Sequence, residues 1–161
     1  MKFRKDFVTN SSSSSYICDI CDREECGYDL SLSDIYMNEC ENGHVFCQDH
    51  MTFDTFTVDS FKKAVENDRW LDSSLKEKIR YSDESLETLI DMVKKECDNY
   101  SIPAFMCPIC SFNSVSMSDV EKYKSAKLRQ TDEAIKKEIK EKFDCYDDFK
   151  KYIDSRMREV K

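Results

Sequence analysis

Cysteine and histidine residues limit most strongly what this chain can fold into, because they recur in pairs at the spacing of metal ligands. The chain has nine cysteines and two histidines in 161 residues. Both histidines and two of the cysteines lie within residues 40–50. One Cys-x-x-Cys pair precedes this segment and another follows it. In chain order the eight candidate ligands are Cys18, Cys21, Cys40, His44, Cys47, His50, Cys107 and Cys110.

Thiolate and imidazole groups in this number are the ligand set that two tetrahedral zinc ions require. We therefore expect the protein to bind two Zn²⁺ ions. The four ligand pairs can be combined in two ways. In a sequential arrangement, the first and second pairs along the chain share one ion, and the third and fourth share the other. In a cross-braced arrangement, the first pair joins the third, and the second pair joins the fourth.

The charge of the ligand-rich segment argues against a finger that reads nucleic acid. Ten acidic residues and a single basic residue, Arg23, lie between Asp19 and Asp54, and the whole chain has a net charge of −8. Zinc fingers that bind DNA need basic surfaces, because contacts to phosphate dominate their affinity. The sequence therefore favours a protein partner and makes nucleic acid an unfavourable one.

The cysteine count also predicts the compartment of the protein. An odd number of cysteines, histidines at ligand spacing and the lack of an apolar leader segment indicate metal-bound thiolates in a reducing cytoplasm rather than disulfides. No apolar stretch approaches the roughly 18–20 residues that a membrane span needs. We expect a cytoplasmic protein that does not bind membranes.

Helices are expected in residues 51–106, because the whole chain has only two glycines and two prolines. Asp59 can cap a helix that begins near Ser60, and a short helix fits residues 74–80. A longer helix is predicted from Ser82 or Asp83. Its apolar stripe consists of Leu86, Leu89, Ile90, Val93 and Cys97. We expect Cys97 to be a buried core thiol.

The C-terminal segment is also predicted to be helical. Ser118 and Glu121 match a capping box, and Thr131 can cap a helix that places Ile135, Ile139 and Phe143 on one side. A last helix is expected from about Tyr146. Its residues predicted for burial are Phe149, Tyr152, Ile153 and Met157. We interpret this region as a helical hairpin that packs on the zinc unit or on a partner.

The order and spacing of the ligands resemble the RING finger family. The matching pattern is Cys-x2-Cys, then Cys-x3-His-x2-Cys-x2-His, then Cys-x2-Cys, over residues 18–110. Gly43 and Phe46 also match the Gly-His-x-Phe-Cys core that is common in that family. The resemblance implies the cross-braced arrangement, with a second variable loop at 51–106 that is long for the family. A histidine is less common at the position of His50, and Cys26 is the reserve ligand.

The RING resemblance also implies a way of binding partners. RING fingers are known mainly as ubiquitin ligases that bind a ubiquitin-conjugating enzyme without covalent chemistry of their own. Ile20 in the first Cys-x-x-Cys, together with Pro108 and Ile109 in the last, match the residues that bind this partner. Ligases of the family often have a basic residue just after the last cysteine. Here Ser111, Phe112 and Asn113 follow it.

A second resemblance concerns the first seventeen residues. The run Lys-Asp-Phe-Val-Thr-Asn followed by five serines and Tyr-Ile resembles a short signature found on uncharacterised clostridial and prophage proteins. It implies a bacterial or prophage source and no activity. Its flanking apolar residues favour a short strand or loop packed against the body.

These observations predict an α-helical protein with a small zinc-stabilised β/loop module: a RING-like cross-brace with a helical insertion and a C-terminal helical hairpin. The expected division is a Ser-rich segment at 1–17, a RING-like zinc domain at 18–115 with its insertion at 51–106, and a helical region at 116–161. Both histidines are ligands, so no catalytic residue is expected. The favoured function is a non-catalytic protein–protein interaction module. The alternative is a RING-type ligase of a ubiquitin-like conjugation system, which is the only enzyme activity that the sequence favours.

Overall fold

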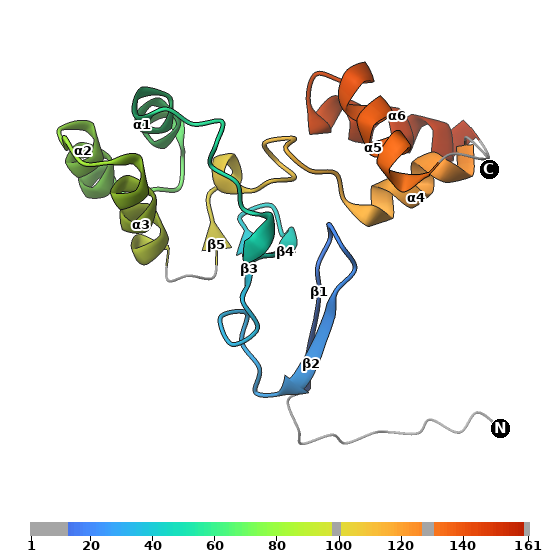
Figure 1. Cartoon of the computed structure of the whole chain (residues 1–161), viewed down its shortest axis with the longest axis horizontal. Coiled ribbons are helices and arrows are strands. Elements are labelled where there is room, and N and C mark those ends of the chain that lie inside the picture. The colour runs from blue at the N-terminus through green and yellow to red at the C-terminus, as the bar shows by residue number, and fades with distance from the viewer. Residues whose placement is uncertain (1–12, 98–100, 127–130, 160–161) are drawn as a thin grey trace.

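The computed structural model describes residues 13–97, 101–126 and 131–159, and folds them into two small sheets and six α-helices. The helices form two lobes, one on each side of a central module of short strands (Figure 1). The expected combination of helices with a small β/loop module is therefore present.

The central module is a three-stranded sheet of order β4-β3-β5. Its strands are β3 (Met37–Cys40), β4 (Val45–Cys47) and β5 (Ser101–Ile102). β3 and β4 form an antiparallel hairpin whose turn contains Gly43, at φ +78°. The amide of Gly43 donates to the carbonyl of Cys40 at 2.7 Å, and an Asn-Gly sequence is typical of such a tight turn. β5 pairs with β3 in parallel and so returns the chain to the module after the helical insertion.

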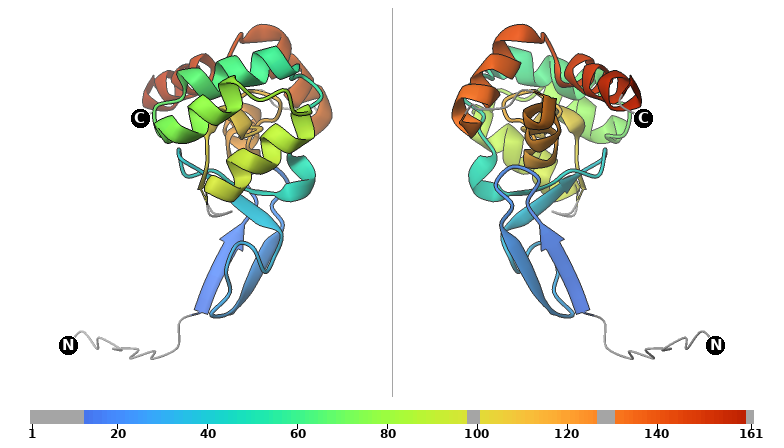
Figure 2. Two further views of the ribbon diagram at one scale, coloured as in Figure 1. Left: turned by 90° about the vertical axis from the view of Figure 1, so that its left-hand side faces the viewer. Right: turned by 90° about the vertical axis from the view of Figure 1, so that its right-hand side faces the viewer.

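A separate antiparallel hairpin holds the first Cys-x-x-Cys. It consists of β1 (Ser13–Ile17) and β2 (Glu24–Tyr28). Its connecting loop lies at the central module, while the open ends of the two strands project away from both lobes (Figures 1 and 2). β1 thus covers residues 13–17 of the predicted N-terminal strand or loop. Residues 1–12 of that prediction lie outside the described residues.

The insertion forms the first helical lobe. Its helices are α1 (Val58–Asn67), α2 (Ser73–Arg80) and α3 (Leu86–Glu96). Phe61, Val65, Ile79, Leu89 and Val93 are at most 1 % exposed, so the lobe has an apolar core of its own. Most of the predicted stripe of α3 is buried as expected. Cys97 at its C-terminal end is only half-buried, because the helix has already ended there.

The C-terminal region forms the second lobe from three helices rather than the predicted hairpin. They are α4 (Met117–Ala126), α5 (Asp132–Lys142) and α6 (Tyr146–Glu159). α4 packs against both α5 and α6. Ile135, Ile139, Phe149 and Ile153 are buried as predicted, whereas Met157 is 49 % exposed because it lies near the end of α6, beyond the core.

The helix starts were predicted less well than the helices. α1 is capped by Thr57 rather than Asp59, and α3 by Ser85 rather than Ser82 or Asp83. α4 begins two residues earlier than predicted, since the Ser116 hydroxyl rather than that of Ser118 caps it and accepts from the amide of Asp119 at 3.2 Å. Thr131 caps α5 as predicted. In each of the wrong cases, a second capping residue lay within a few positions, and propensity alone does not choose between them.

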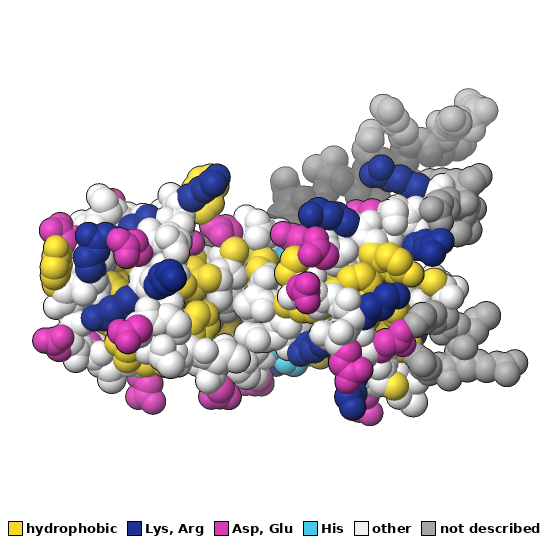
Figure 3. All heavy atoms as spheres, turned by 90° about the horizontal axis from the view of Figure 1, so that it is seen from above, with side chains coloured by type: hydrophobic (Ala, Val, Ile, Leu, Met, Phe, Trp, Pro, Cys, Tyr) yellow, Lys and Arg dark blue, Asp and Glu magenta, His cyan; other side chains and the backbone are white. Residues whose placement is uncertain are grey.

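The surface of the helical lobes carries both signs of charge. Figure 3 shows acidic and basic side chains interspersed on this face, with no broad basic field. Within the described residues, no helix is both long and apolar enough to pass through a lipid bilayer.

Candidate metal centre

The eight predicted ligands come together in two groups of four. One group contains Cys18, Cys21, Cys47 and His50, and the other contains Cys40, His44, Cys107 and Cys110. Within each group, the candidate ligand atoms all lie within 4.8 Å of one another. The first pair along the chain joins the third and the second joins the fourth. The grouping is therefore the cross-braced one of the two arrangements that the ligand spacing allows.

Local backbone turns bring the two sulfurs of each Cys-x-x-Cys together. In the first turn, the amide of Asp22 donates to the carbonyl of Cys18 at 2.9 Å. In the last turn, the amide of Ser111 donates to the carbonyl of Cys107, also at 2.9 Å. The same bond thus closes both loops, from the residue after the second cysteine to the first cysteine.

The β3–β4 hairpin sends one ligand pair to each group. Cys40 ends β3, and His44 stands just before β4. The two residues lie at opposite ends of the turn, and the Cys40 amide donates to the His44 carbonyl at 3.0 Å. Cys47 ends β4, and His50 ends the 3-10 helix η1 (Gln48–His50) that follows. One short hairpin therefore supplies two ligands to each group, and this shared hairpin is what makes the arrangement cross-braced.

The distances between ligand atoms fit a tetrahedral ion. With a zinc–sulfur bond of about 2.3 Å, two sulfurs on a tetrahedron are about 3.8 Å apart. The Sγ atoms of Cys40 and Cys110 are 3.8 Å apart, and those of Cys21 and Cys47 are 3.9 Å apart. His44 Nδ1 lies 3.3–3.8 Å from the three sulfurs of its group. A disulfide needs about 2.05 Å, and none of the nine cysteines, all of which the structure describes, forms one.

In the group that contains His44, the pKa values of the histidine and of a cysteine are shifted in opposite directions. Hydrogen bonds from His44 to the sulfurs of Cys110 and Cys40 raise the pKa of His44 to about 10. Hydrogen bonds from Cys107 and Cys110 lower the pKa of Cys40 strongly. Without an ion, a proton on His44 compensates the thiolate charge. A bound divalent cation would take over that role, because it binds thiolates and neutral imidazole.

The first group has a similar division between its thiols. Burial raises the pKa of Cys18, but backbone hydrogen bonds involving Cys47, Ile20 and Cys21 outweigh burial and lower it overall. Burial and the neighbouring sulfur of Cys18 raise the pKa of Cys47 to about 12. One thiolate is thus favoured in each group before any ion binds, and a metal would deprotonate the remaining thiols.

Residues around the ligands hold them in place. Asn42 donates from Nδ2 to the sulfur of Cys110 at 3.2 Å. The carboxylate of Asp19 accepts from the amide of Val45 at 2.8 Å, and its own backbone carbonyl accepts from the amide of Met117 at 2.6 Å. Asp19 therefore ties the first Cys-x-x-Cys to β4 and to α4 at the same time. Such contacts orient metal ligands and support their affinity.

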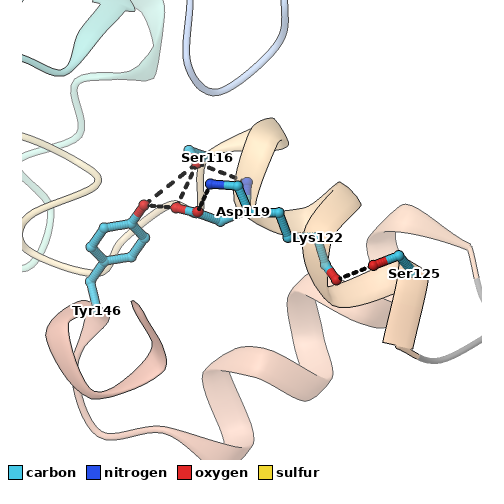
Figure 4. A network of polar contacts seen from close by, with 5 residues as sticks. All are labelled: Ser116, Asp119, Lys122, Ser125 and Tyr146. Carbon is cyan, nitrogen blue, oxygen red and sulfur yellow. Dashed lines mark hydrogen bonds and ion pairs between the residues drawn. The ribbon is translucent and has the colours of Figure 1, made fainter. Parts of the chain in front are cut away.

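A buried polar cluster that the sequence analysis missed joins the second group to the C-terminal lobe. The ring of Tyr146 packs edge-on against His44, with centroids 5.8 Å apart. The Tyr146 hydroxyl donates to the Asp119 carboxylate, which also accepts from Ser116 and pairs with Lys122 at 3.1 Å (Figure 4). Tyr146 and Asp119 are both 4 % exposed. The Ser-x-x-Asp sequence was the only local signal for the cluster, and it predicts a helix cap rather than a contact with Tyr146.

The other predicted site residues lie as follows. Cys26 is exposed on β2 and belongs to neither group, whereas His50 does belong to one. Ile20 is 6 % exposed, Ile109 is fully buried and Pro108 is buried too. A cavity of about 390 Å³ between Ile20 and α5 places the C-terminal lobe over the first Cys-x-x-Cys. The three residues that the RING resemblance implies for partner binding are thus buried within this chain.

Comparisons with protein-family models, curated proteins and solved structures gave no match to this chain. What the site can bind is therefore inferred from the geometry of its residues.

Proposed function

We propose that this protein binds two zinc ions and acts as a protein–protein interaction module without covalent catalysis of its own. The observation that carries the proposal is the gathering of all eight predicted ligands into two four-ligand groups. Each group contains thiolates and one imidazole at tetrahedral spacing, which suits zinc better than harder cations such as magnesium or calcium.

The same grouping supports a structural rather than a catalytic role for the metal. Four protein ligands complete a tetrahedral shell, so no position is left for a water or a substrate. Both histidines of the chain are ligands and cannot also serve as general bases. The metal would instead fix the fold of a polar segment that is too small to be stable by apolar burial alone.

The first test is the metal content of the native protein, measured by mass spectrometry. We expect two zinc ions per chain. His50→Ala should lose one of them, because it removes one of four ligands, while the matched control Cys26→Ala should keep both. One ion or none in the native protein, or loss of an ion from Cys26→Ala with retention in His50→Ala, would contradict the proposal.

The interaction role needs its own test. We expect the zinc-loaded protein on an affinity resin to retain a partner. The His50→Ala variant should not retain it, because the substitution disturbs the part of the protein that the partner binds. A single carboxylate whose removal abolished a turnover reaction would instead identify an enzyme.

We do not extend the proposal to a ligase of a ubiquitin-like system. Ile20, Pro108 and Ile109 would have to lie on the surface to bind a conjugating enzyme, and they are buried here. The direct measurement is discharge of a charged conjugating enzyme in the presence of the protein. Faster transfer to lysine would restore this alternative.

A further inference from the structure

A hollow lies where the insertion lobe meets the metal module, by which we mean the three-stranded sheet together with the two candidate ligand groups. A cavity of about 530 Å³ is lined by residues from three places that are far apart in the sequence. Glu41 follows the metal-ligand residue Cys40, Trp70 to Asp72 connect α1 to α2, and Glu96 ends α3. Ile102, on the strand that pairs with β3, and Pro103, which follows that strand, also line the cavity.

Trp70 is the most unusual residue of this cavity. It is the only tryptophan of the chain, and it is 81 % exposed. Its backbone is nevertheless fixed, because the Asp68 carboxylate accepts from the amides of Trp70 and Leu71 at 2.8 and 3.0 Å. Leu71 is buried beside it. An exposed indole on a backbone held in this way offers a large contact area whose burial by a partner would be favourable.

The charges of the cavity are all negative. Its lining includes the carboxylates of Glu41, Asp72 and Glu96, and no Lys or Arg is among the described residues that line it. Glu41 accepts from the amide of Ala104 at 2.9 Å through Oε1. Its other oxygen, Oε2, is buried and has no hydrogen-bond partner within the part of the chain that is described. A buried carboxylate oxygen without a partner is costly unless a ligand satisfies it.

The carboxylates do not converge as metal ligands would. Among the described residues, only the two Cys/His groups place three or more candidate ligand atoms close enough to hold an ion. The acidic groups of the cavity are instead spread around an apolar and aromatic wall. This arrangement suits a cation that is carried on an aliphatic stem.

We propose that this cavity binds a lysine or arginine side chain of a partner protein. The aliphatic stem would pack on Trp70 and Leu71, and the cationic head would interact with the indole face and with the carboxylates of Glu41 and Glu96. The inference rests on the proposed interaction function and specifies its partner as a protein with an exposed basic segment.

The metal module would set the shape of this cavity. The amide of Glu41 donates to the carbonyl of Ile102 at 3.0 Å, and Glu41 directly follows a candidate ligand of the second group. A second hollow of about 360 Å³ is also lined by Glu41 and Trp70, but its lining includes the basic residue Arg69. The first cavity is therefore the better site for a basic side chain.

The test uses the zinc-loaded full chain and small probes of known chemistry. We would titrate it with the N-acetyl methylamides of lysine, arginine, norleucine and citrulline, and follow the indole N–H signal of Trp70 by NMR. Saturable shifts are expected with the lysine and arginine probes, with dissociation constants on the order of millimolar because the probes are small. The uncharged probes should cause much smaller shifts.

Variants with matched charge distinguish the site from general acidity. Glu96→Gln and Glu41→Gln should each weaken lysine-probe binding by about two- to fivefold. Asp91→Asn changes the net charge equally from an exposed position on α3 that does not line the cavity, and should leave binding unchanged. Equal shifts with norleucine, absence of saturation, or an equal loss in Asp91→Asn would each overturn the inference. Metal content is measured on the same samples, so a failure here is distinguishable from a failure of the zinc proposal.

Discussion

Asp119 and Tyr146 form a buried contact within the C-terminal lobe, next to the candidate ligand His44. The Tyr146 ring packs on His44, and its hydroxyl donates to a carboxylate that has two other polar contacts, with Ser116 and Lys122. Asp119→Ala would leave Tyr146 and Ser116 without their acceptor in a buried place. We expect it to lower the free energy of unfolding by about 2–3 kcal/mol, measured by denaturant titration of the metal-loaded protein.

Tyr146→Phe should cost less, about 1 kcal/mol, because it removes one hydrogen bond and keeps the ring. Asp148→Asn is the matched control, since its carboxylate is exposed on the same helix. The double variant of Asp119 and Tyr146 should destabilise the protein less than the sum of the single changes. Full additivity would contradict the contact.

The pKa of His44 makes a prediction about metal affinity. Because its pKa is raised to about 10 in the absence of an ion, His44 holds a proton at every pH below that value, and an incoming metal must displace it. Zinc affinity should therefore rise with pH, by at least about tenfold per unit between pH 6 and 8. Competition against a chelator of known affinity measures this. A flat profile would show that zinc binding releases no protons, which would contradict the thiol and imidazole ligands together.

Which residues would gather as ligands could be predicted from the sequence, because pair spacing limits which sulfurs can share an ion. The surroundings of the ligands could not. Tyr146 lies far from His44 in the sequence, and no local sequence pattern indicates their contact. Long-range packing of this kind depends on how a whole lobe docks, which residue types alone do not specify.

At the level of elements, the insertion lobe is attached through aromatic rings. Phe61 on α1 is fully buried and packs edge-on against Phe56 and against Phe105, each at 5.6 Å between centroids. Phe105 lies two residues before Cys107, in the 3-10 helix η2 (Ala104–Met106). Phe61→Ala should lower the free energy of unfolding by about 3–5 kcal/mol, because it leaves a cavity in this cluster.

The metal content should survive that change. None of the eight ligands lies on α1, so Phe61→Ala should still bind two zinc ions while the lobe loses protection against hydrogen exchange. Lys63→Ala, at an exposed position on the same helix, is the control and should behave like the native protein. Loss of zinc from Phe61→Ala alone would mean that the lobe is needed to hold the second group.

Helix existence was predictable from the apolar periodicity, whereas helix starts were not. Candidate caps lie close together around Thr57 and Ser116, and the tertiary position of the chain decides which one is used. The burial of Ile20, Pro108 and Ile109 was also unpredictable, because apolar residues in a Cys-x-x-Cys loop are equally suited to a partner or to the chain's own helices.

On the scale of the whole molecule, the metal module connects three bodies: the β1–β2 hairpin and the two helical lobes (Figures 1 and 2). Its buried residues include Cys18, Cys40, Cys47 and Cys107, so ligands form part of the core itself. The two helical lobes differ from the module, because their cores contain no candidate ligand. The α1–α3 lobe has its own apolar core, and the C-terminal lobe has one around Ile135, Ile139 and Phe149.

Removal of zinc should therefore unfold the protein unevenly. Chelation under reducing conditions leaves three thiols or thiolates close together in each group without an ion to neutralise them, and the module has too little apolar area to remain folded. We expect hydrogen-exchange protection to be lost first at residues 18–50 and 101–110. The helices of α1–α3 should keep part of their helical circular dichroism, since their core contains no ligand. A cooperative loss of all protection would show instead that the module and both lobes fold as one unit, and unchanged protection would mean that the metal is not structural.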